Sequence, residues 1–375
     1  MTEAKKTPLY DWHAAHGGRM VEFGGWLMPV QYSSIVTEHQ ATRQAVGLFD
    51  ISHMGRLHFV GPEGADFLNR MVTKDVEKIG PGRIRYALMT NDQGGVKDDV
   101  LVYHLTNAAK ESYRVLVVNA GNREKILSWI RDHLLHDPAR NDIDWFDLTG
   151  EWAMLAIQGP KALELLQPLV EVDLSSMKYY TGLETSIAGV GSVVSRTGYT
   201  GEDGFELMVG APASVNLWEQ LIERAAPLGG MAAGLGCRDT LRLEAAMPLY
   251  GHELEEDINP YQAGLSFAVD LNKTAFPGLE VLKQAATDNS QPVRIGLEVE
   301  GKRIPRQEAA ILTSDAARQI GFVTSGTSSP TLGKVIAMGF VDRTLSAEGT
   351  HLIVDIRGHQ TPAKVVPLPF YKRAK

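Results

Sequence analysis

The chain is 375 residues long, and 44% of its residues are hydrophobic while 22% are charged. This composition is typical of a globular protein and argues against a disordered, collagen-like or coiled-coil chain. The length predicts two or three domains, and the formal net charge of −8 argues against a nucleic-acid-binding protein, whose contact surface would be basic.

The N-terminus and the cysteine content indicate a compartment. No apolar run approaches the roughly 18 residues that a membrane-spanning helix needs, and residues 1–6 lack the apolar stretch of a secretory signal. The single cysteine, Cys237, excludes a disulfide framework and any zinc site built from several cysteines. We therefore expect a cytoplasmic protein with no membrane segment.

Helices and strands alternate irregularly over the first 270 residues or so. This mixture is typical of an α+β fold rather than of a regular βαβ alternation. Apolar residues at helical spacing predict helices over Ser34–Leu48, Gly64–Met71, Lys125–Leu135, Lys161–Leu169 and Val215–Ala226. Strand patterns cover Gly55–Val60 and Glu184–Val194.

The pattern changes after a polar stretch that ends near Gln291. From there to Tyr371 the chain consists of short strand-like runs separated by turns. Such spacing is typical of a small barrel or sandwich. The expected strands are Arg294–Glu298, Ile320–Thr324, Ala337–Phe340, His351–Ile356 and Ala363–Val366.

Familiar cofactor motifs find no support in the sequence. The stretch Gly326–Lys334 has the wrong glycine spacing for a phosphate loop, and Val335 stands where that loop needs Ser or Thr. Gly189–Gly191 lacks the third glycine of a dinucleotide fingerprint. Two histidine pairs have no partner cluster of metal-ligand type, so we expect no metal. Those pairs are His13 with His16 and His133 with His136. Without a dinucleotide fingerprint we also expect no flavin.

The segment Asn91–Tyr103 combines a turn with a strand. Its first five residues, Asn-Asp-Gln-Gly-Gly, form a turn sequence, and the following residues alternate between two strand faces. Asp99 and Tyr103 then share one face, and Asp98 lies on the other. Asp99 is a carboxylate beside an aromatic residue, and hence a candidate general base or cation-stabilising group. The alternative is two aspartates at the solvated end of a hairpin.

A second carboxylate candidate lies in the glycine-rich segment Arg196–Leu207. Glycines allow a tight fold or a close approach to a ligand. Glu206 stands between Phe205 and Leu207 and therefore points to the opposite strand face. A carboxylate there could accept two parallel hydrogen bonds from a planar pair of N–H donors. An exposed glutamate in a hairpin, or one paired with arginine, is the alternative.

Arg238 is the candidate in the segment Gly234–Glu244. Asp239 can cap a helix that Pro248 ends, which predicts that Arg238 lies just outside the cap, where a ligand oxygen can reach it. An ordinary pair between arginine and a carboxylate is the alternative. His53 and Met54, just before the strand Gly55–Val60, are by themselves typical of structural residues.

Together these segments resemble the aminomethyltransferase (T protein) family of the glycine cleavage system. The resemblance follows the family's order along nearly the whole chain, which makes it specific although no single motif is. The matching stretches are Thr7–Tyr10, Gly24–Val30, Phe49–Gly55, Gly94–Tyr103, Ser195–Leu207, Gly234–Glu244, Leu249–Glu253, Thr324–Lys334 and Pro369–Tyr371.

The resemblance implies a reaction and its partners. The one-carbon unit of an aminomethyl group, carried on the lipoyl arm of the H protein, passes to tetrahydrofolate as co-substrate. The products are 5,10-methylenetetrahydrofolate, ammonia and the dihydrolipoyl carrier. The resemblance also implies functional association with glycine decarboxylase and dihydrolipoyl dehydrogenase, and it requires no metal, flavin, nucleic acid or membrane.

The resemblance implies a cloverleaf of three domains around a central folate channel. On this basis we expect domain 1 over residues 1–50 plus 140–245, domain 2 over residues 51–139 plus 246–275, and a C-terminal β-barrel over residues 285–375. The barrel agrees with the strand pattern that follows Gln291.

The family's functional residues map onto individual positions of this chain. Asp99 matches the essential carboxylate, which would stabilise a cationic one-carbon unit and take protons from folate nitrogens. Glu206 matches the pterin-reading carboxylate, and Arg238 matches an arginine that contacts folate. The remaining matched or neighbouring pocket positions are Met54, Tyr86, Tyr103, Asn119 and Tyr199, with Arg306, Tyr371 and Lys372 as weaker matches at the folate mouth.

Two positions depart from the family pattern. Cys237 stands where relatives commonly carry alanine, which argues against a nucleophilic thiol. Phe276–Glu280 reads Phe-Pro-Gly-Leu-Glu instead of the more usual Phe-x-Gly-Lys, which leaves the linker to the last domain open.

Three other functions compete with this interpretation. A folate-binding accessory protein of iron–sulfur assembly would carry a Lys-Gly-Cys-Tyr-x-Gly-Gln motif, which is absent. A demethylase of dimethylglycine or sarcosine would need a flavin domain or a separate flavoprotein. A hydrolase that uses Asp99 lacks supporting oxyanion machinery.

Overall fold

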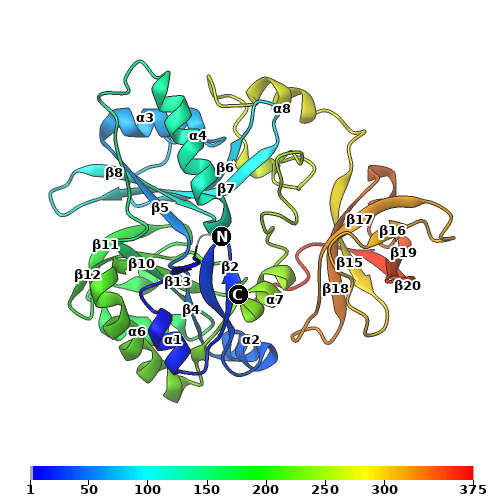
Figure 1. Ribbon diagram of the computed structural model, residues 1–375, viewed down its shortest axis with the longest axis horizontal. Coiled ribbons are helices and arrows are strands. Elements are labelled where there is room, and N and C mark those ends of the chain that lie inside the picture. Colours follow the sequence, from blue (N-terminus) through cyan, green and yellow to red (C-terminus); the bar gives the residue numbers. More distant parts are fainter. Residues whose placement is uncertain (1–2, 375) are drawn as a thin grey trace. The chain divides into compact units, whose positions relative to one another are not determined.

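The computed structural model describes residues 3–374. Two compact units divide them. Unit 1 consists of the described residues up to Met89, together with Asp98–Gly198 and Glu202–Arg238. Unit 2 consists of Thr90–Lys97, Tyr199–Gly201 and the described residues from Asp239 onward. Unit 1 carries open sheets and most of the helices, and unit 2 carries a closed barrel (Figure 1).

A six-stranded sheet forms the largest core of unit 1. Its strand order is β11-β12-β13-β10-β4-β14, and helices α5 (Ala162–Leu166) and α6 (Ala211–Ala225) pack on it. Trp218 of α6 is fully buried in this core because alternate strand residues and one stripe of the helix are apolar. The strands are β4 (Gly47–Asp50), β10 (Trp152–Gln158), β11 (Gly182–Ile187), β12 (Val190–Ser195), β13 (Gly204–Gly210) and β14 (Met231–Ala232).

A five-stranded sheet, in the order β6-β7-β8-β5-β9, carries most of the residues discussed below. Helices α3 (Gly61–Met71) and α4 (Arg123–Leu135) contribute apolar residues to the core on one of its faces, and Figure 1 shows both beside it. The strands are β5 (Gly55–Val60), β6 (Ile84–Thr90), β7 (Val96–Thr106), β8 (Ser112–Val118) and β9 (Asp144–Asp147).

The N-terminal part of unit 1 adds a small sheet in the order β1-β3-β2. It is accompanied by the helices α1 (Tyr10–Ala15) and α2 (Ile35–Gln44). Ser34 caps α2, since its hydroxyl accepts a hydrogen bond from the Thr37 backbone N–H at 3.1 Å. The strands are β1 (Lys5–Lys6), β2 (Arg19–Phe23) and β3 (Trp26–Gln31).

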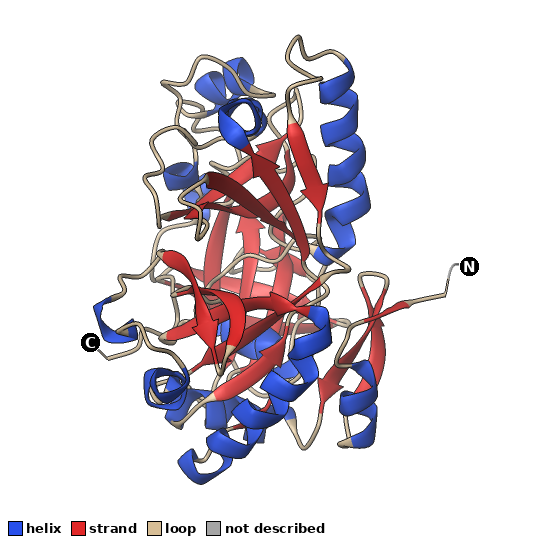
Figure 2. Ribbon diagram, turned by 90° about the vertical axis from the view of Figure 1, so that its left-hand side faces the viewer, coloured by secondary structure: helices blue, strands red, loops and turns tan. Residues whose placement is uncertain are grey.

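The closed barrel of unit 2 has the strand order β15-β18-β17-β16-β19-β20. It confirms the barrel that the strand pattern predicts, and the mixture of helices and strands confirms the α+β class (Figure 2). Helix α8 (Leu279–Ala285) also belongs to this unit, and helix α7 (Leu235–Glu244) carries the chain from unit 1 into it. The strands are β15 (Val293–Val299), β16 (Ala310–Leu312), β17 (Gln319–Ser328), β18 (Val335–Val341), β19 (His351–Ile356) and β20 (His359–Val366).

Three predicted elements end or change type inside their predicted range. The helix predicted over Ser34–Leu48 ends at Gln44, because Leu48 pairs with β10 as part of β4. The predicted strand Glu184–Val194 is a hairpin, since Ala188 and Gly189 both adopt positive φ angles between β11 and β12. The predicted helix Lys161–Leu169 gives way to a 3₁₀ turn that contains a proline. Within the barrel, the sequence pattern also missed the three-residue strand β16, while the three-domain boundaries stay a prediction.

Candidate active site

Strand register places three of the predicted residues in one row of the five-stranded sheet. Gly55 of β5 pairs with Val118 of β8, and Leu101 of β7 pairs with Val117. Continuing this antiparallel register sets Met54 and Asp99 on either side of Asn119. Residues far apart in the sequence therefore meet at one end of the sheet.

Asp99 is held there by two neutral donors. The Tyr86 hydroxyl donates to its Oδ2 at 3.1 Å, and the Asn119 side-chain amide donates to its Oδ1 at 2.7 Å. All three side chains are partly exposed, so a ligand can reach them. The sequence predicted each of these residues, and the structure brings them together.

The carboxylate of Asp99 is unusually basic for an aspartate. Burial raises its pKa, although the hydrogen bonds from Tyr86 and Asn119 act in the opposite direction. Among the described residues, no cationic side chain forms an ion pair with it. A partly exposed carboxylate with a raised pKa is suited to accept a proton and, once ionised, to stabilise a neighbouring positive charge.

Glu206 lies on the six-stranded sheet with one carboxylate oxygen engaged. Thr197 donates its hydroxyl to Oε2 at 2.5 Å, and no hydrogen bond to Oε1 is formed within residues 3–374. The flanking residues Phe205 and Leu207 belong to the core, as the predicted alternation requires. Burial raises the pKa of Glu206, while Thr197 and the charge of Arg238 lower it.

Two tyrosines of unit 1 lie near Glu206, and the charge of Asp99 also acts on one of them, Tyr180. The Tyr103 hydroxyl lies 3.4 Å from Ser195 Oγ, and Ser195 pairs with Glu206 across β12 and β13. Tyr103 is fully buried, so direct contact with a ligand would require it to become exposed. Tyr180 is partly exposed, and burial together with the charges of Tyr179, Glu206 and Asp99 raises its pKa.

Sequence reasoning missed Tyr180, and its backbone explains why. Its φ of 60° is in the left-handed region, which residues other than glycine rarely adopt. The residue precedes β11 and belongs to no regular element, so periodicity gives no signal for it. Thr197, the hydrogen-bond donor to Glu206, was missed as well, because only its tertiary contact distinguishes it from other threonines.

Arg238 occupies a different local structure from the predicted one. Helix α7 begins at Leu235, so Arg238 lies inside its first turns and Asp239 is not the cap. The glycines around residue 235 are compatible with this earlier start because a Cβ at Gly234 or Gly236 would collide with the Val30 backbone or the Ile35 side chain. Arg238 stays partly exposed, and its charge acts on Glu206 and on His53.

His53 is buried and electrically neutral. Burial lowers its pKa to about 3, and the charges of Arg238 and Arg56 act in the same direction against that of Asp50. Its Nδ1 has no hydrogen-bond partner within the described part of the chain. Arg56 donates hydrogen bonds to the Ser52 and Met54 carbonyls and thereby fixes the backbone on both sides of this histidine.

Four predicted residues lie in unit 2 and are described within it. The Tyr199 hydroxyl donates to the Pro248 carbonyl, and the Tyr371 backbone N–H donates to the Glu244 carbonyl at 2.8 Å. Arg306 and Lys372 are exposed. Their predicted contacts with folate stay predictions.

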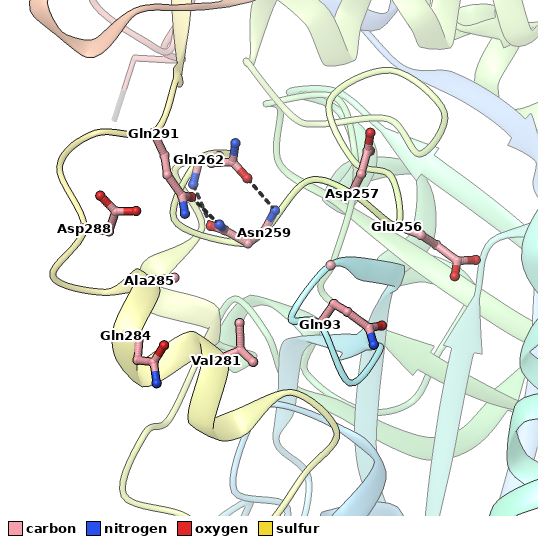
Figure 3. Close-up of a pocket in the computed structure, with 11 residues that line it drawn as sticks. Gln93, Glu256, Asp257, Asn259, Gln262, Val281, Gln284, Ala285, Asp288 and Gln291 are labelled. Carbon is pink, nitrogen blue, oxygen red and sulfur yellow. Dashed lines mark hydrogen bonds between the residues drawn. The ribbon is translucent and has the colours of Figure 1, made fainter.

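Unit 2 also has an open pocket of about 400 Å³ between α8 and the turn before β7. Amides and carboxylates line it, and Asn259 bonds to Gln291 at 2.5 Å and to the Gln262 side chain at 2.9 Å (Figure 3). None of the predicted site residues lines this pocket. Its lining residues are Gln93, Gly95, Glu256, Asp257, Asn259, Gln262, Val281, Gln284, Ala285, Asp288 and Gln291.

The described residues offer neither a metal-binding cluster nor a membrane-spanning helix. No group of three or more histidine, cysteine, aspartate or glutamate side chains within residues 3–374 could hold a metal ion. No helix in the same range is long and apolar enough to cross a membrane.

Comparison with known proteins supplies the family. Residues 9–273 match the family described as the GCVT N-terminal domain, and residues 293–372 match the glycine cleavage T-protein C-terminal barrel domain. The chain belongs to the glycine cleavage T-protein family. The second match covers the barrel strands, which agrees with the closed barrel of unit 2.

Curated relatives and a solved structure extend this likeness over the full length. An aminomethyltransferase of Moorella thermoacetica is 45% identical over 375 residues, with all of both chains covered. One of Anoxybacillus flavithermus is 44% identical over 373 residues, covering 99% of this chain and 100% of the relative. The crystal structure of the glycine cleavage system aminomethyltransferase T from Bartonella henselae matches with a TM-score of 0.88 at 30% identity, over 98% of each chain.

Proposed function

We infer that the protein is an aminomethyltransferase of the glycine cleavage system. It transfers the one-carbon unit from the aminomethyl-lipoyl arm of the H protein to tetrahydrofolate and releases ammonia, 5,10-methylenetetrahydrofolate and dihydrolipoyl H protein. The full-length family match is the observation that carries this function. The row formed by Met54, Asn119 and Asp99 supports the assignment of the chemistry to unit 1.

The residues present fit a folate ring. Glu206 has one carboxylate oxygen that accepts from Thr197 and another that forms no hydrogen bond within residues 3–374. A planar donor pair, such as a ring N–H beside an amino group, would satisfy a buried carboxylate of this kind. Arg238 contributes positive charge to the same surroundings. Tetrahydrofolate would supply the nitrogen nucleophiles that accept the one-carbon unit.

Asp99 is the proposed catalytic carboxylate. Its Oδ1 and Oδ2 each accept one hydrogen bond, which fixes the orientation of the group while leaving lone pairs available. In the ionised form it can stabilise a cationic one-carbon unit, and it can accept a proton from a substrate nitrogen. Its raised pKa brings the acid closer to working pH, which favours proton transfer.

The partners are proposed from the family. The substrate carrier is the lipoylated H protein, and glycine decarboxylase and dihydrolipoyl dehydrogenase complete the cycle that loads and reoxidises it. We propose that the reaction takes place in the cytoplasm.

The decisive experiment compares wild-type protein with Asp99→Asn. Aminomethyl-loaded H protein is mixed with each protein, with and without tetrahydrofolate, and ammonia and methylenetetrahydrofolate are measured. We expect wild type to turn over only with folate and Asp99→Asn to lose about 10²–10⁴-fold in rate. Asp92→Asn is the matched control, because Asp92 is an exposed carboxylate in the turn before the same strand.

Two readouts separate folding from chemistry in this experiment. The circular dichroism spectrum and the folate affinity of Asp99→Asn should remain close to those of the wild type. An Asp99→Asn protein that keeps a rate within about threefold of wild type would refute the role of this carboxylate. A wild-type protein that binds folate but releases no ammonia would refute the aminomethyltransferase function.

A further inference from the structure

Asp98, the residue before the proposed catalytic carboxylate, is completely buried. Its carboxylate accepts three hydrogen bonds. The Asn119 backbone N–H donates to Oδ2 at 3.0 Å, the Asn119 side-chain amide donates to Oδ1 at 2.8 Å, and the Asn122 amide donates to Oδ1 at 2.6 Å. Asp98 therefore holds Asn119 at both its main chain and its side chain.

The same Asn119 nitrogen serves both aspartates. Nδ2 lies 2.8 Å from Asp98 Oδ1 and 2.7 Å from Asp99 Oδ1, with the Asp99 backbone oxygen farther away at 3.2 Å. An amide nitrogen has only two hydrogens, and an ionised carboxylate can only accept. Two carboxylates on the same side thus fix the orientation of the amide, with its nitrogen rather than its oxygen toward Asp99.

The two carboxylates share this amide without a balancing cation. Among residues 3–374, no lysine, arginine or histidine forms an ion pair with Asp98 or Asp99. The nearest cations along the chain are engaged elsewhere. Lys97 bonds to Glu256 at 3.0 Å, and the Arg123 guanidinium pairs with Asp147.

We propose that Asp98 is a positioning residue that clamps the Asn119 amide against Asp99. The proposal deepens the catalytic role proposed for Asp99 and rests on it. Two like charges linked through one amide disfavour double ionisation, since each raises the energy of the other's charged form.

The electrostatic surroundings of the pair agree with this role. Burial, followed by the charge of Asp99, raises the pKa of Asp98 to about 7, and the two asparagines act against that rise. Besides Asp98, the groups that face Asp99 are the Tyr86 hydroxyl from β6, Asn119 after β8, and Tyr180 from the segment before β11. The tyrosines are neutral near pH 7, so the two aspartates are the groups of this set that titrate, and the charge of Asp99 opposes the ionisation of Asp98.

The test is the pH dependence of kcat/KM for methylenetetrahydrofolate formation by Asp98→Asn. In the wild type, ionisation of Asp98 beside the charged Asp99 should give a second step in the pH profile near pH 7, and Asp98→Asn should lack this step. The plateau should fall about tenfold, because the amide that replaces a carboxylate oxygen can no longer accept from the Asn119 backbone. Val100→Ala is the control: Val100 is a buried core residue two positions along the same strand face, and this variant should lose stability but keep the second step.

The outcomes separate the proposal from the function on which it rests. A wild-type pH profile and plateau in Asp98→Asn, with Asp99→Asn still inactive, overturn the positioning role and leave the catalytic role intact. Full activity in Asp99→Asn overturns the catalytic role itself. If Asp98→Asn does not fold, the coupling between the two aspartates is tested instead by following the carbon-13 signals of the aspartate carboxyl groups of the wild type as pH changes. Two coupled steps that become one in Asp99→Asn support the proposal, and two independent single steps overturn it.

Discussion

Buried carboxylates in the two units are stabilised in opposite ways. In unit 2, Glu253 bonds to the Arg242 guanidinium at 2.9 Å, with further donors from Thr324 and the Leu249 backbone. Burial raises its pKa, but the charge of Arg242 and these hydrogen bonds together lower it below the ordinary value. In unit 1, Asp98 receives hydrogen bonds only from neutral amide groups, and its pKa rises to about 7.

The difference separates carboxylates that stabilise the fold from those available for chemistry. Glu253 has a lowered pKa, so its contribution to stability is present above the unfolded-state value near 4 and is lost as pH falls through the folded-state value. Asp98 has a raised pKa, so its contribution is present below about pH 4 and is lost as pH rises through about 7. Carboxylates of the second kind lower stability at neutral pH, which is typical of functional groups.

The largest expected effect on stability comes from breaking the pair in unit 2. Glu253→Gln leaves the buried Arg242 guanidinium without its buried charged partner and should lower the free energy of unfolding by about 3–5 kcal/mol. Urea denaturation followed by circular dichroism measures the loss. Asp239→Asn is the matched control, because Asp239 contacts the same guanidinium from a largely exposed position and should cost no more than about 1 kcal/mol. Equal losses of stability in the two variants would contradict the conclusion that the buried carboxylate of Glu253 stabilises Arg242 more than the exposed Asp239 does.

A smaller effect, on binding, is expected at Glu206. Glu206→Gln removes the charge that would accept two hydrogen bonds from the folate ring, and it should weaken folate binding about 10–100-fold. Isothermal titration with tetrahydrofolate measures the change. Glu202→Gln is the control, because Glu202 is bonded to Arg43 at 2.8 Å and should affect stability rather than binding. An unchanged folate affinity in Glu206→Gln would show that Glu206 does not take part in folate binding.

Local patterns predicted the elements that carry the site better than they predicted the contacts within it. Alternation along β7 assigned Asp98 and Asp99 to opposite faces, and Val100 and Val102 do pack in the core on the face of Asp98. Alternation gives no information about partners across strands, so the clamp on Asn119 could not be predicted.

The sequence patterns also did not predict where backbone segments pack closely together. Helix α7 starts four residues before the predicted cap, and its start depends on how closely Gly234 and Gly236 approach the β3 and α2 region. Composition alone indicates that glycines permit such an approach, but it does not indicate which segment they approach. The barrel was predictable because its strands are successive in the chain and its turns are evenly spaced.

The smallest expected effect is at Cys237, which stands next to Arg238 in α7. The thiol is fully buried, and its sulfur lies 3.9 Å from the Thr42 hydroxyl. Cys237→Ala removes one buried atom and should lower the free energy of unfolding by about 1 kcal/mol, with turnover unchanged, because the backbone that positions Arg238 is retained. Urea denaturation and the ammonia assay measure both quantities on one preparation. A loss of turnover that exceeds the loss of stability would show that packing behind α7 controls Arg238. In that case the properties of a carboxylate such as Glu206 would depend on the apolar packing behind Arg238 as well as on its own hydrogen bonds and charges.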